Sequence, residues 1–371
     1  MNRTVTLVVV DPSGALLGQL PPFEVAAPWW QDVSEFGRED RPVLRLLHGD
    51  EPGPPGGHVT YLSETSDRPG GLLPAEVDLA PHPHRAAYAE AGGPTASVAW
   101  ARAALDRPVT AHQRRTWNLS SIWRFDGSDG EPVAWLKQVP SFFAHEPAAL
   151  ALVAEVAPDL VPPVIAVGAE GRMLLPHVKG EDRYGAGPEL CDRIAEAFHP
   201  AQTALAKSDL SEIKGRFDPK RVRNVAEPYF DKIDGLAALV DDLPARLAAA
   251  DECGLPDTLV HGDLYPGNVR TDAAGHLTIL DWGDCIVGNP AFDILRLTDD
   301  LDDPEPVLDA WAYRWAKSVP GSRPQRAVEL LRPVAALRNA VAYADFLDRI
   351  EPSEWPYHAR DVPESLAAAL L

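Results

Sequence analysis

The sequence has few cysteines and no long hydrophobic run. Its three cysteines, at positions 191, 253 and 285, are odd in number and far apart, and none belongs to a Cys-x-x-Cys motif. This usage argues against a disulfide framework and favours a reduced, cytoplasmic protein with buried thiols. No stretch of about 18 uninterrupted apolar residues is present, which excludes a transmembrane helix. The apolar run before Asp11 is too short for a signal peptide and predicts a first strand instead.

Basic residues are scarce relative to acidic ones. The chain has 34 Lys and Arg against 55 Asp and Glu, a net charge of −21. Such a surface repels nucleic acid and anionic lipid, so we expect neither nucleic acid nor a membrane as a partner, and it mildly favours cationic ligands. The simpler interpretation, in which the charge only keeps the protein dissolved, stays open. A monomer is favoured.

The composition is that of an ordinary folded protein, with 45% hydrophobic and 8% aromatic residues. We find no internal repeat. At 371 residues the chain exceeds the size at which one hydrophobic core usually keeps growing. Two or three subdomains are therefore expected.

The patterns predict an α+β chain in three parts. Residues 1–90 are expected to form a small α/β N-terminal cap, 91–180 a β-rich lobe, and 181–371 a helical lobe. Strands are predicted over 4–10, 15–20, 43–47, 58–62, 117–125, 133–139, 161–167, 173–176, 269–271 and 277–280. Helices are predicted over 96–105 (capped by Thr95), 143–157, 190–206, 228–250, 306–317, 324–348 and 363–371.

The segment 258–284, TLVHGDLYPGNVRTDAAGHLTILDWGD, combines a hairpin with polar residues at its open end. The turn DAAG joins the predicted strands 269–271 and 277–280. Because opposed residues of an antiparallel hairpin have a constant index sum, this turn places Asn268 nearly opposite Asp281. The loop 261–267 brings Asp263 to the same end. Three oxygen-bearing side chains are therefore expected to converge there.

These residue types suit phosphate chemistry. The amide oxygen of Asn268 and the carboxylate of Asp281 are oxygen ligands for a hard cation, and so few protein ligands are typical of Mg²⁺ held jointly with phosphates. Asp263, if not used for metal, can accept the proton of a hydroxyl nucleophile. The five-residue offset from Asp263 to Asn268 matches the catalytic loop of protein kinases.

Two departures from the protein-kinase pattern identify a narrower resemblance. Gly262 stands where those kinases have Arg, and DWGD at 281–284 stands where they have DFG. HGDxxxxN followed by LDWxD and by GNPAFD at 288–293 resembles the aminoglycoside phosphotransferase and choline kinase-like family, over roughly residues 110–371. The resemblance implies a bilobal protein-kinase-like fold that uses ATP and Mg²⁺. A second HGD at 48–50 lacks the other residues, so the tripeptide alone carries no weight.

The resemblance also implies nucleotide-binding residues in the β-rich lobe. Lys137, the lone charge in VAWLKQVP, and Glu146 match the strand lysine and helix glutamate that position the phosphates. A surface lysine at a strand edge is the alternative. The glycine-rich phosphate loop of protein kinases is absent, and Ser120 or Ser121 would donate to a phosphate instead. The hinge that meets adenine is expected in MLLPHVKG, with Pro176 and His177 at its centre.

Further residues are expected to support the site. In the family the residue corresponding to His261 supports the catalytic loop, although a role as ligand or base stays open. Asp293 is expected to hold the same loop by hydrogen bonds. Asp284 is either a second metal contact or a cap of its turn.

The acceptor is expected to be a small sugar or amino sugar bound among the helices after residue 293. Trp355 would stack on a sugar face, and the carboxylates of Asp300 and Glu354, with Tyr343, would hold polar or ammonium groups. Bacterial maltokinases and glucosamine kinases of this superfamily carry an added N-terminal cap, and maltokinases are longer. The chain therefore most resembles a glucosamine kinase acting on the 6-hydroxyl. Maltose or another neutral sugar, an aminoglycoside, an amino alcohol such as choline, or a non-catalytic nucleotide-binding regulator are the alternatives.

Overall fold

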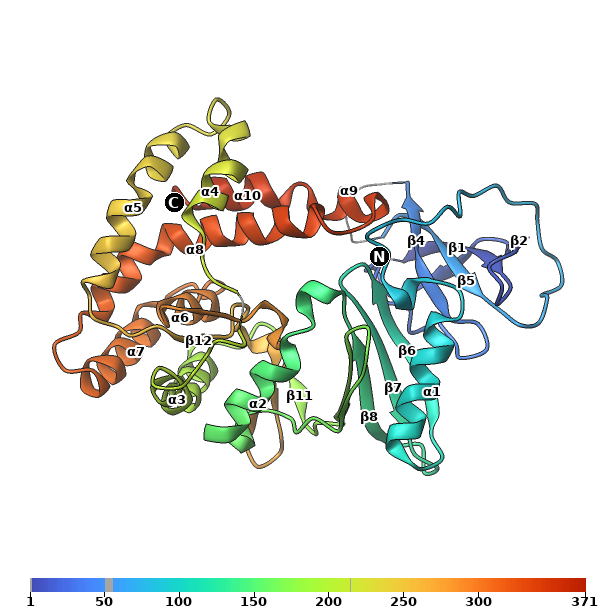
Figure 1. Ribbon diagram of the computed structural model, residues 1–371, viewed down its shortest axis with the longest axis horizontal. Coiled ribbons are helices and arrows are strands. Elements are labelled where there is room, and N and C mark those ends of the chain that lie inside the picture. Colours follow the sequence, from blue (N-terminus) through green and yellow to red (C-terminus); the bar gives the residue numbers. More distant parts are fainter. Residues whose placement is uncertain (1, 51–55, 214) are drawn as a thin grey trace. The chain divides into compact units, whose positions relative to one another are not determined.

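The computed structural model describes residues 2–50, 56–213 and 215–371. The chain divides into two compact units, each built from segments distant in sequence (Figure 1). The first unit comprises Met1–Ala144, Val164–His177 and Asp345–Arg360, and the second comprises His145–Pro163, Val178–Ala344 and Asp361–Leu371. None of the described helices is long and apolar enough to cross a bilayer. The boundaries at residues 90 and 180 stay a prediction.

The first sheet of the first unit confirms the strands expected near the N-terminus. It contains β1 (Arg3–Val10), β2 (Leu16–Gln19), β3 (Phe23–Val25), β4 (Val43–Gly49) and β5 (His58–Glu64), in the order β2-β1-β5-β4 with β3 also paired to β1. β1 and β5 are parallel, and the remaining pairs are antiparallel. Alternate residues of β1 belong to two different cores, so both faces of this strand are buried. This explains its continuous apolar run.

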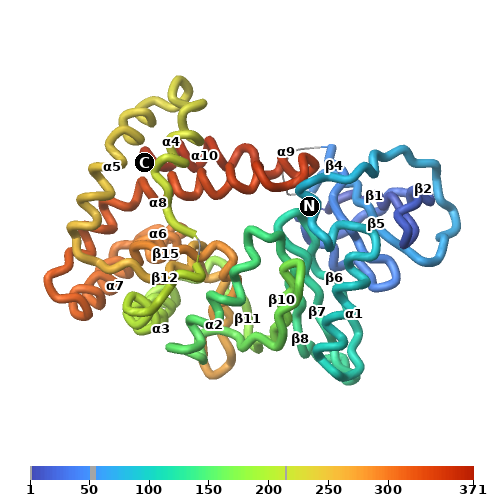
Figure 2. The backbone as a smooth tube through the Cα atoms, in the orientation of Figure 1, coloured from blue at the N-terminus to red at the C-terminus, as the bar shows by residue number. Residues whose placement is uncertain are grey.

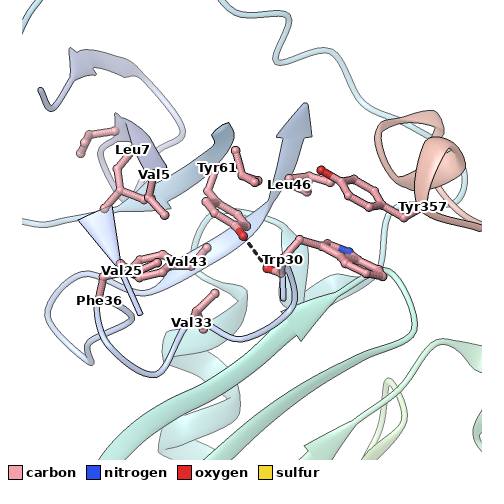
Figure 3. Close-up of a cluster of buried hydrophobic side chains, with 12 residues drawn as sticks. Val5, Leu7, Val25, Trp30, Val33, Phe36, Val43, Leu46, Tyr61 and Tyr357 are labelled. Carbon is pink, nitrogen blue, oxygen red and sulfur yellow. Dashed lines mark hydrogen bonds between the residues drawn. The ribbon is translucent and has the colours of Figure 1, made fainter. Parts of the chain in front are cut away.

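The core on one face of this sheet includes a residue from the far end of the chain. The short helix α9 (Trp355–His358) places Tyr357 against Trp30, with stacked rings whose centroids lie 4.4 Å apart. Figure 3 shows this stack and the hydrogen bond that the Tyr61 hydroxyl donates to the Trp30 carbonyl. Residues 345–360 are therefore part of the first unit's core.

The second sheet of the first unit has the order β6-β7-β8-β10-β9. Its strands are β6 (Thr110–Trp117), β7 (Ser120–Asp126), β8 (Pro132–Gln138), β9 (Ala166–Val167) and β10 (Arg172–Pro176). Helix α1 (Gly93–Leu105) covers one face, where Val98 and Ala101 pack on Trp123, Phe125 and Leu136 (Figure 1). The helix begins two residues before the predicted cap Thr95, after Gly92 in a left-handed conformation.

Two strand predictions in this sheet had wrong bounds. The strand expected over 117–125 is β7, which begins only at Ser120, because Trp117 ends β6 and the turn between the two strands lies at Asn118 and Leu119. β6 went unpredicted because two of its three buried positions, Gln113 and Thr116, are polar. Gln113 accepts from Val43 N (2.8 Å) and donates to Val43 O (2.7 Å). The strand expected over 161–167 shrinks to β9, since Pro162 and Pro163 supply no backbone N–H to a ladder.

The second unit is mainly helical. Its helices are α2 (Glu146–Val156), α3 (Pro188–Leu205), α4 (Pro219–Ala226), α5 (Leu236–Asp251), α6 (Ala291–Leu297), α7 (Glu305–Ser318), α8 (Pro324–Leu347, which ends in the first unit) and α10 (Asp361–Ala368). Helices α3 and α7 lie side by side (Figure 2). The helix predicted over 228–250 is confirmed only from Leu236 on, because α5 begins after Gly235, whose backbone is left-handed.

Two small sheets lie among these helices. One pairs β12 (Thr258–Val260) with β15 (Ile286–Gly288), and the other has the order β11-β13-β14, with β11 at Glu181–Asp182, β13 at Val269–Thr271 and β14 at Leu277–Ile279. The antiparallel pairing of β13 and β14 confirms the predicted hairpin. Leu280 N donates to Asn268 O (2.8 Å), so Asn268 lies opposite Leu280, one residue before Asp281.

Candidate active site

The catalytic loop begins where the buried strand β12 ends, and its second residue must be glycine. Gly262 has φ +86°, a conformation that L side chains rarely adopt. A Cβ built on it would lie 2.1 Å from Asp284 O. The Gly of this HGD is thus fixed by close contact between two loops. In the other HGD, Gly49 ends strand β4 and Asp50 pairs with His58 at 3.1 Å.

His261 uses both ring nitrogens on the backbone around it. Nε2 lies 2.9 Å from Leu280 O, and Nδ1 lies 3.3 Å from Asp263 N. These partners assign the proton to Nε2, which donates to the carbonyl while Nδ1 accepts from the amide. The ring is completely buried and packs on Trp282. These contacts are those of a residue that supports the loop.

Asp293, in α6, holds the same loop through hydrogen bonds to the loop backbone. Its Oδ2 accepts from His261 N (3.0 Å) and from Gln202 Nε2 (2.9 Å), and its Oδ1 accepts from Gly262 N (3.0 Å). Burial raises the pKa of Asp293 to about 6, against the opposing effect of those hydrogen bonds. One buried carboxylate therefore accepts from two consecutive loop amides, and this fixes the backbone from which the Asp263 side chain projects.

Asp263 and Asn268 are in direct contact. Asn268 Nδ2 donates to Asp263 O (2.9 Å) and to Asp263 Oδ2 (3.1 Å). With its nitrogen so used, the amide of Asn268 presents its oxygen as the group available to a cation. The other carboxylate oxygen, Asp263 Oδ1, accepts from Arg296 Nε at 2.8 Å. The Asp263 side chain is 37% exposed, so a ligand can reach it.

Asp281 has a strained backbone. It follows β14 and Leu280 with φ 63° and ψ 65°, a left-handed conformation that is uncommon for a residue with a side chain. Such strain concentrates at functional sites. The hairpin register puts Asp281 at the same end as Asn268. One carboxylate and one amide oxygen are a donor set that fits Mg²⁺ shared with phosphates.

Among the residues that the structure describes, no group of three or more His, Cys, Asp or Glu side chains could hold a metal by itself.

The turn after Asp281 is held from two sides. Trp282 is completely buried, and its N–H donates to Glu146 Oε1 (3.1 Å) at the first residue of α2. Arg338, in α8, donates from Nη1 to Gly262 O (2.9 Å) and from Nη2 to Asp284 O (3.1 Å). Arg338 thus ties the catalytic loop to the DWGD turn.

Comparison with known proteins identifies the family. Residues 134–325, which are 192 of 371, match the model of a phosphotransferase enzyme family, the APH family. The chain belongs to this phosphotransferase family. A search of curated proteins found no match to the chain.

Solved structures similar to this phosphotransferase have the kinase-like fold. The macrolide 2′-phosphotransferase MphH of Brachybacterium faecium is 19% identical, with a TM-score of 0.50 over 74% of this chain and 98% of that chain. The choline kinase LicA of Streptococcus pneumoniae is 12% identical, with a TM-score of 0.50 over 68% and 90%. A Plasmodium vivax ethanolamine kinase is 10% identical, with a TM-score of 0.50 over 71% and 82%. At these identities the likeness shows the fold alone, which is α+β, bilobal and protein-kinase-like.

The proposed nucleotide-binding residues of the phosphotransferase are divided between the units. Lys137 lies in β8 on the face with Trp135, while its neighbours Leu136 and Gln138 are buried. Glu146 begins α2 in the second unit. Their pairing stays a prediction.

Ser120 and Ser121 lie in β7, and both side chains are buried. The Ser120 hydroxyl accepts from Trp117 Nε1 at 2.7 Å, just beyond the β6–β7 turn. Their contact with a phosphate stays a prediction.

Pro176 and His177 lie at the end of the second of the three segments that make up the first unit. His177 N donates to Val133 O (3.0 Å), and its Nδ1 accepts from Trp135 Nε1 (3.0 Å). The hinge at this position and its contact with adenine stay predictions.

The structure removes Glu354 from the acceptor residues. Its side chain is completely buried in the first unit, and both carboxylate oxygens lie 3.1 Å from Asn118 N in the β6–β7 turn. A carboxylate so enclosed cannot hold an acceptor, so this prediction was wrong. Trp355 is 45% exposed, and its Nε1 donates to Leu347 O (3.1 Å). Asp300 is exposed and Tyr343 half-buried in the second unit, with roles that stay predictions.

Glu354 makes stability depend on pH. Burial raises its pKa from 4.5 to about 7. The stability that it contributes is therefore fully present below about pH 4.5 and is lost as the pH rises through about 7. Glu354→Gln stays neutral and can still accept from Asn118 N. We expect the variant to unfold at higher temperature than the wild type at pH 8, by the equivalent of at most about 3 kcal/mol, and at a similar temperature at pH 5.

Thermal unfolding followed between pH 5 and pH 8 measures this difference. Glu131→Gln, which changes an exposed carboxylate of the same unit, is the matched control and should follow the wild type at every pH. A gap between wild type and Glu354→Gln that stays constant across the range would rule out titration of Glu354 as its cause.

Three residues of the site were missed by sequence reasoning: Gln202, Arg296 and, in its observed role, Arg338. All three act from helices: Gln202 donates to the carboxylate of Asp293, Arg296 donates to the carboxylate of Asp263, and Arg338 donates to the backbone of the loop. Only Arg296 left a signal, because it follows Asp293 by three residues and so lies on the same face of one helix.

Proposed function

We propose that this phosphotransferase is an ATP- and Mg²⁺-dependent small-molecule kinase that transfers the γ-phosphate to a sugar hydroxyl, with Asp263 as the base. The proposal rests chiefly on the contact of Asn268 Nδ2 with Asp263 Oδ2 at 3.1 Å. It joins a reachable carboxylate to an amide at the end of the hairpin where Asp281 also lies. Base and metal ligands thus have adjacent places without competing for one cation.

In the proposed mechanism the loop residues set the geometry. Asp263 accepts the hydrogen bond of the acceptor hydroxyl and aligns the hydroxyl oxygen with the γ-phosphorus. It accepts the hydroxyl proton as the new P–O bond forms and as the bond between the γ-phosphorus and the leaving ADP breaks. His261 and Asp293 keep the backbone of Asp263 in place. Asn268 and Asp281 would hold Mg²⁺, which when bound neutralises phosphate charge.

We assign the nucleotide-binding roles as the family pattern implies them. Lys137 and Glu146 take the roles of the strand lysine and the helix glutamate that position the phosphates, and the hydroxyl of Ser120 or Ser121 would donate to a phosphate oxygen. The backbone at Pro176 and His177 would meet adenine. Each assignment comes from the family pattern and from the place of the residue in its own unit.

The acceptor that we favour is glucosamine, phosphorylated at its 6-hydroxyl. The presence of an N-terminal sheet before the kinase-like part supports this choice, because bacterial sugar kinases of this superfamily also carry an added N-terminal cap. Asp300 and Tyr343, with the exposed ring of Trp355, are the candidate contacts. We further propose that the enzyme works as a monomer in the cytoplasm, where its three buried free thiols stay reduced.

An ATP-consumption screen tests the acceptor. Glucosamine, maltose, kanamycin and choline are each supplied with ATP and Mg²⁺, and glucosamine is expected to give the highest rate. If only maltose or only kanamycin were consumed, the choice of glucosamine would fail while the kinase assignment stood. ATP binding without consumption in any reaction would favour a non-catalytic regulator.

A further inference from the structure

A second residue of helix α6 acts on the catalytic loop. Asp293 and Arg296 are three residues apart on this helix and so share a face. Asp293 holds the amides of His261 and Gly262. Arg296 Nε donates to Asp263 Oδ1 at 2.8 Å. The same helix face thus fixes both the backbone of the loop and the carboxylate that the loop presents.

The guanidinium of Arg296 is itself held in place. Its central carbon lies 4.5 Å from the centroid of the Tyr265 ring, which belongs to the catalytic loop, a cation–π distance. The Tyr184 ring contacts the Tyr265 ring, with centroids 5.9 Å apart. The Arg296 side chain is only 25% exposed. A side chain stacked on one side and hydrogen-bonded on the other has little freedom to leave Asp263.

Both oxygens of Asp263 therefore have fixed donors. Arg296 binds Oδ1 and Asn268 binds Oδ2, so the plane of the carboxylate is set from two sides. Resting on the proposed function, we propose that Arg296 is a positioning residue that holds Asp263 for the acceptor hydroxyl and disfavours acceptors with an ammonium group beside that hydroxyl.

The discrimination against such acceptors follows from the short distance between their ammonium group and Arg296. A hydroxyl that donates to Asp263 lies about 2.7 Å from a carboxylate oxygen, and the guanidinium is hydrogen-bonded to the same carboxylate. An ammonium group on the neighbouring carbon, as in 2-aminoethanol or choline, is then brought within a few ångströms of Arg296, and like charges repel. An amino sugar that reacts at a hydroxyl several bonds from its nitrogen avoids this repulsion. The site thus favours sugars over amino alcohols.

Kinetics of Arg296→Gln and Arg296→Lys test the positioning role. We expect Arg296→Gln to lower kcat for the best acceptor about 10- to 100-fold while KM for ATP changes less than about twofold, because misplacement of a reacting group affects the transfer step. Arg296→Lys should restore part of the loss. Wild-type kcat in Arg296→Gln overturns the proposal.

Arg314→Gln is the matched control. Arg314 pairs with Asp192 at 2.6 Å, and the two side chains are 19% and 37% exposed, close to the 25% and 37% of Arg296 and Asp263. This variant removes the same charge from a similar ion pair elsewhere in the second unit. Its kcat should stay within about twofold of wild type.

A double-mutant cycle decides whether Arg296 acts through Asp263. In the Asp263→Asn background, Arg296→Gln should lower the residual rate by less than about twofold. A full additional loss in that background would mean that Arg296 works independently of Asp263, against the proposal.

The discrimination against acceptors with a neighbouring ammonium group is measured separately. The ratio of kcat/KM for choline to that for glucosamine should be low in the wild type and should rise at least about fivefold in Arg296→Gln, because the repelling charge is gone. An unchanged ratio, or a wild type that prefers choline, overturns the selection. A wild type that binds ATP but consumes none with any of the acceptors contradicts the proposed function instead, so the two failures are distinguishable.

Discussion

Asp263→Asn is expected to lower phosphoryl transfer by a factor of about 10² or more while ATP still binds, because removal of a positioned base costs about that much. The amide cannot take the proton of the acceptor hydroxyl. Its oxygen can still accept from Arg296, so the loop should keep its conformation. Initial rates with the best acceptor measure the loss, and equilibrium titration with nucleotide measures the retained binding.

The chain supplies its own control for this substitution. Asp50 belongs to the other HGD, at the end of β4, where its carboxylate is exposed and pairs with His58. Asp50→Asn makes the same chemical change in the same tripeptide and should leave the transfer rate unaltered. Unchanged turnover in Asp263→Asn would remove Asp263 from its role as base.

The local geometry of the catalytic loop could be predicted from sequence because it depends on few residues close together in the chain. A short turn fixes the β13–β14 register, and that register puts Asn268 and Asp281 at one end of a hairpin. Family membership followed from the same segment. Gly262 also has a local signature, although the reason for it, the nearby Asp284 carbonyl, is visible only in the structure.

Contacts made by polar residues with distant backbone could not be predicted. Strand β6 reads as polar, yet Gln113 is buried because its amide bonds both backbone groups of Val43. Glu354 and Trp355 are adjacent in an apparently solvent-facing segment, and only the fold shows that the first is enclosed and the second is not. Charge and hydropathy patterns do not show which carboxylates accept hydrogen bonds from buried donors in the folded protein.

The same limit applies to the residues that stiffen the active site. Arg296 comes from α6 and binds the carboxylate of Asp263, a kind of group that many residues of the chain have. Arg338 comes from α8 and binds the backbone carbonyl of Gly262, a group that every residue type has. Nothing in their spacing to the HGD motif marks them. The catalytic residues have a sequence pattern because their chemistry needs particular side chains, while their supports need only a donor or acceptor in the right place.

Asp293→Ala is expected to be among the most damaging single substitutions in the second unit. It leaves the N–H groups of His261 and Gly262 and the amide of Gln202 without their acceptor in a site that is almost completely shielded from water. Loss of one partner in such a buried network typically costs about 3–5 kcal/mol. The transfer rate should also fall steeply, because the backbone that carries Asp263 is no longer fixed.

Thermal unfolding and transfer rates at pH 7 test this pair of effects, with Asp309→Ala, an exposed position of α7, as a control expected to change stability by less than about 0.5 kcal/mol.

Burial raises the pKa of Asp293 to about 6, and this shift predicts how the effect of Asp293→Ala on stability depends on pH. The stability that Asp293 contributes by titration is present below its usual pKa and is lost as the pH rises through about 6. Asp293→Ala should therefore cost more at pH 5 than at pH 8. The opposite order would mean that the carboxylate stabilises the loop chiefly as an anion, as it would if the three donors outweighed its burial.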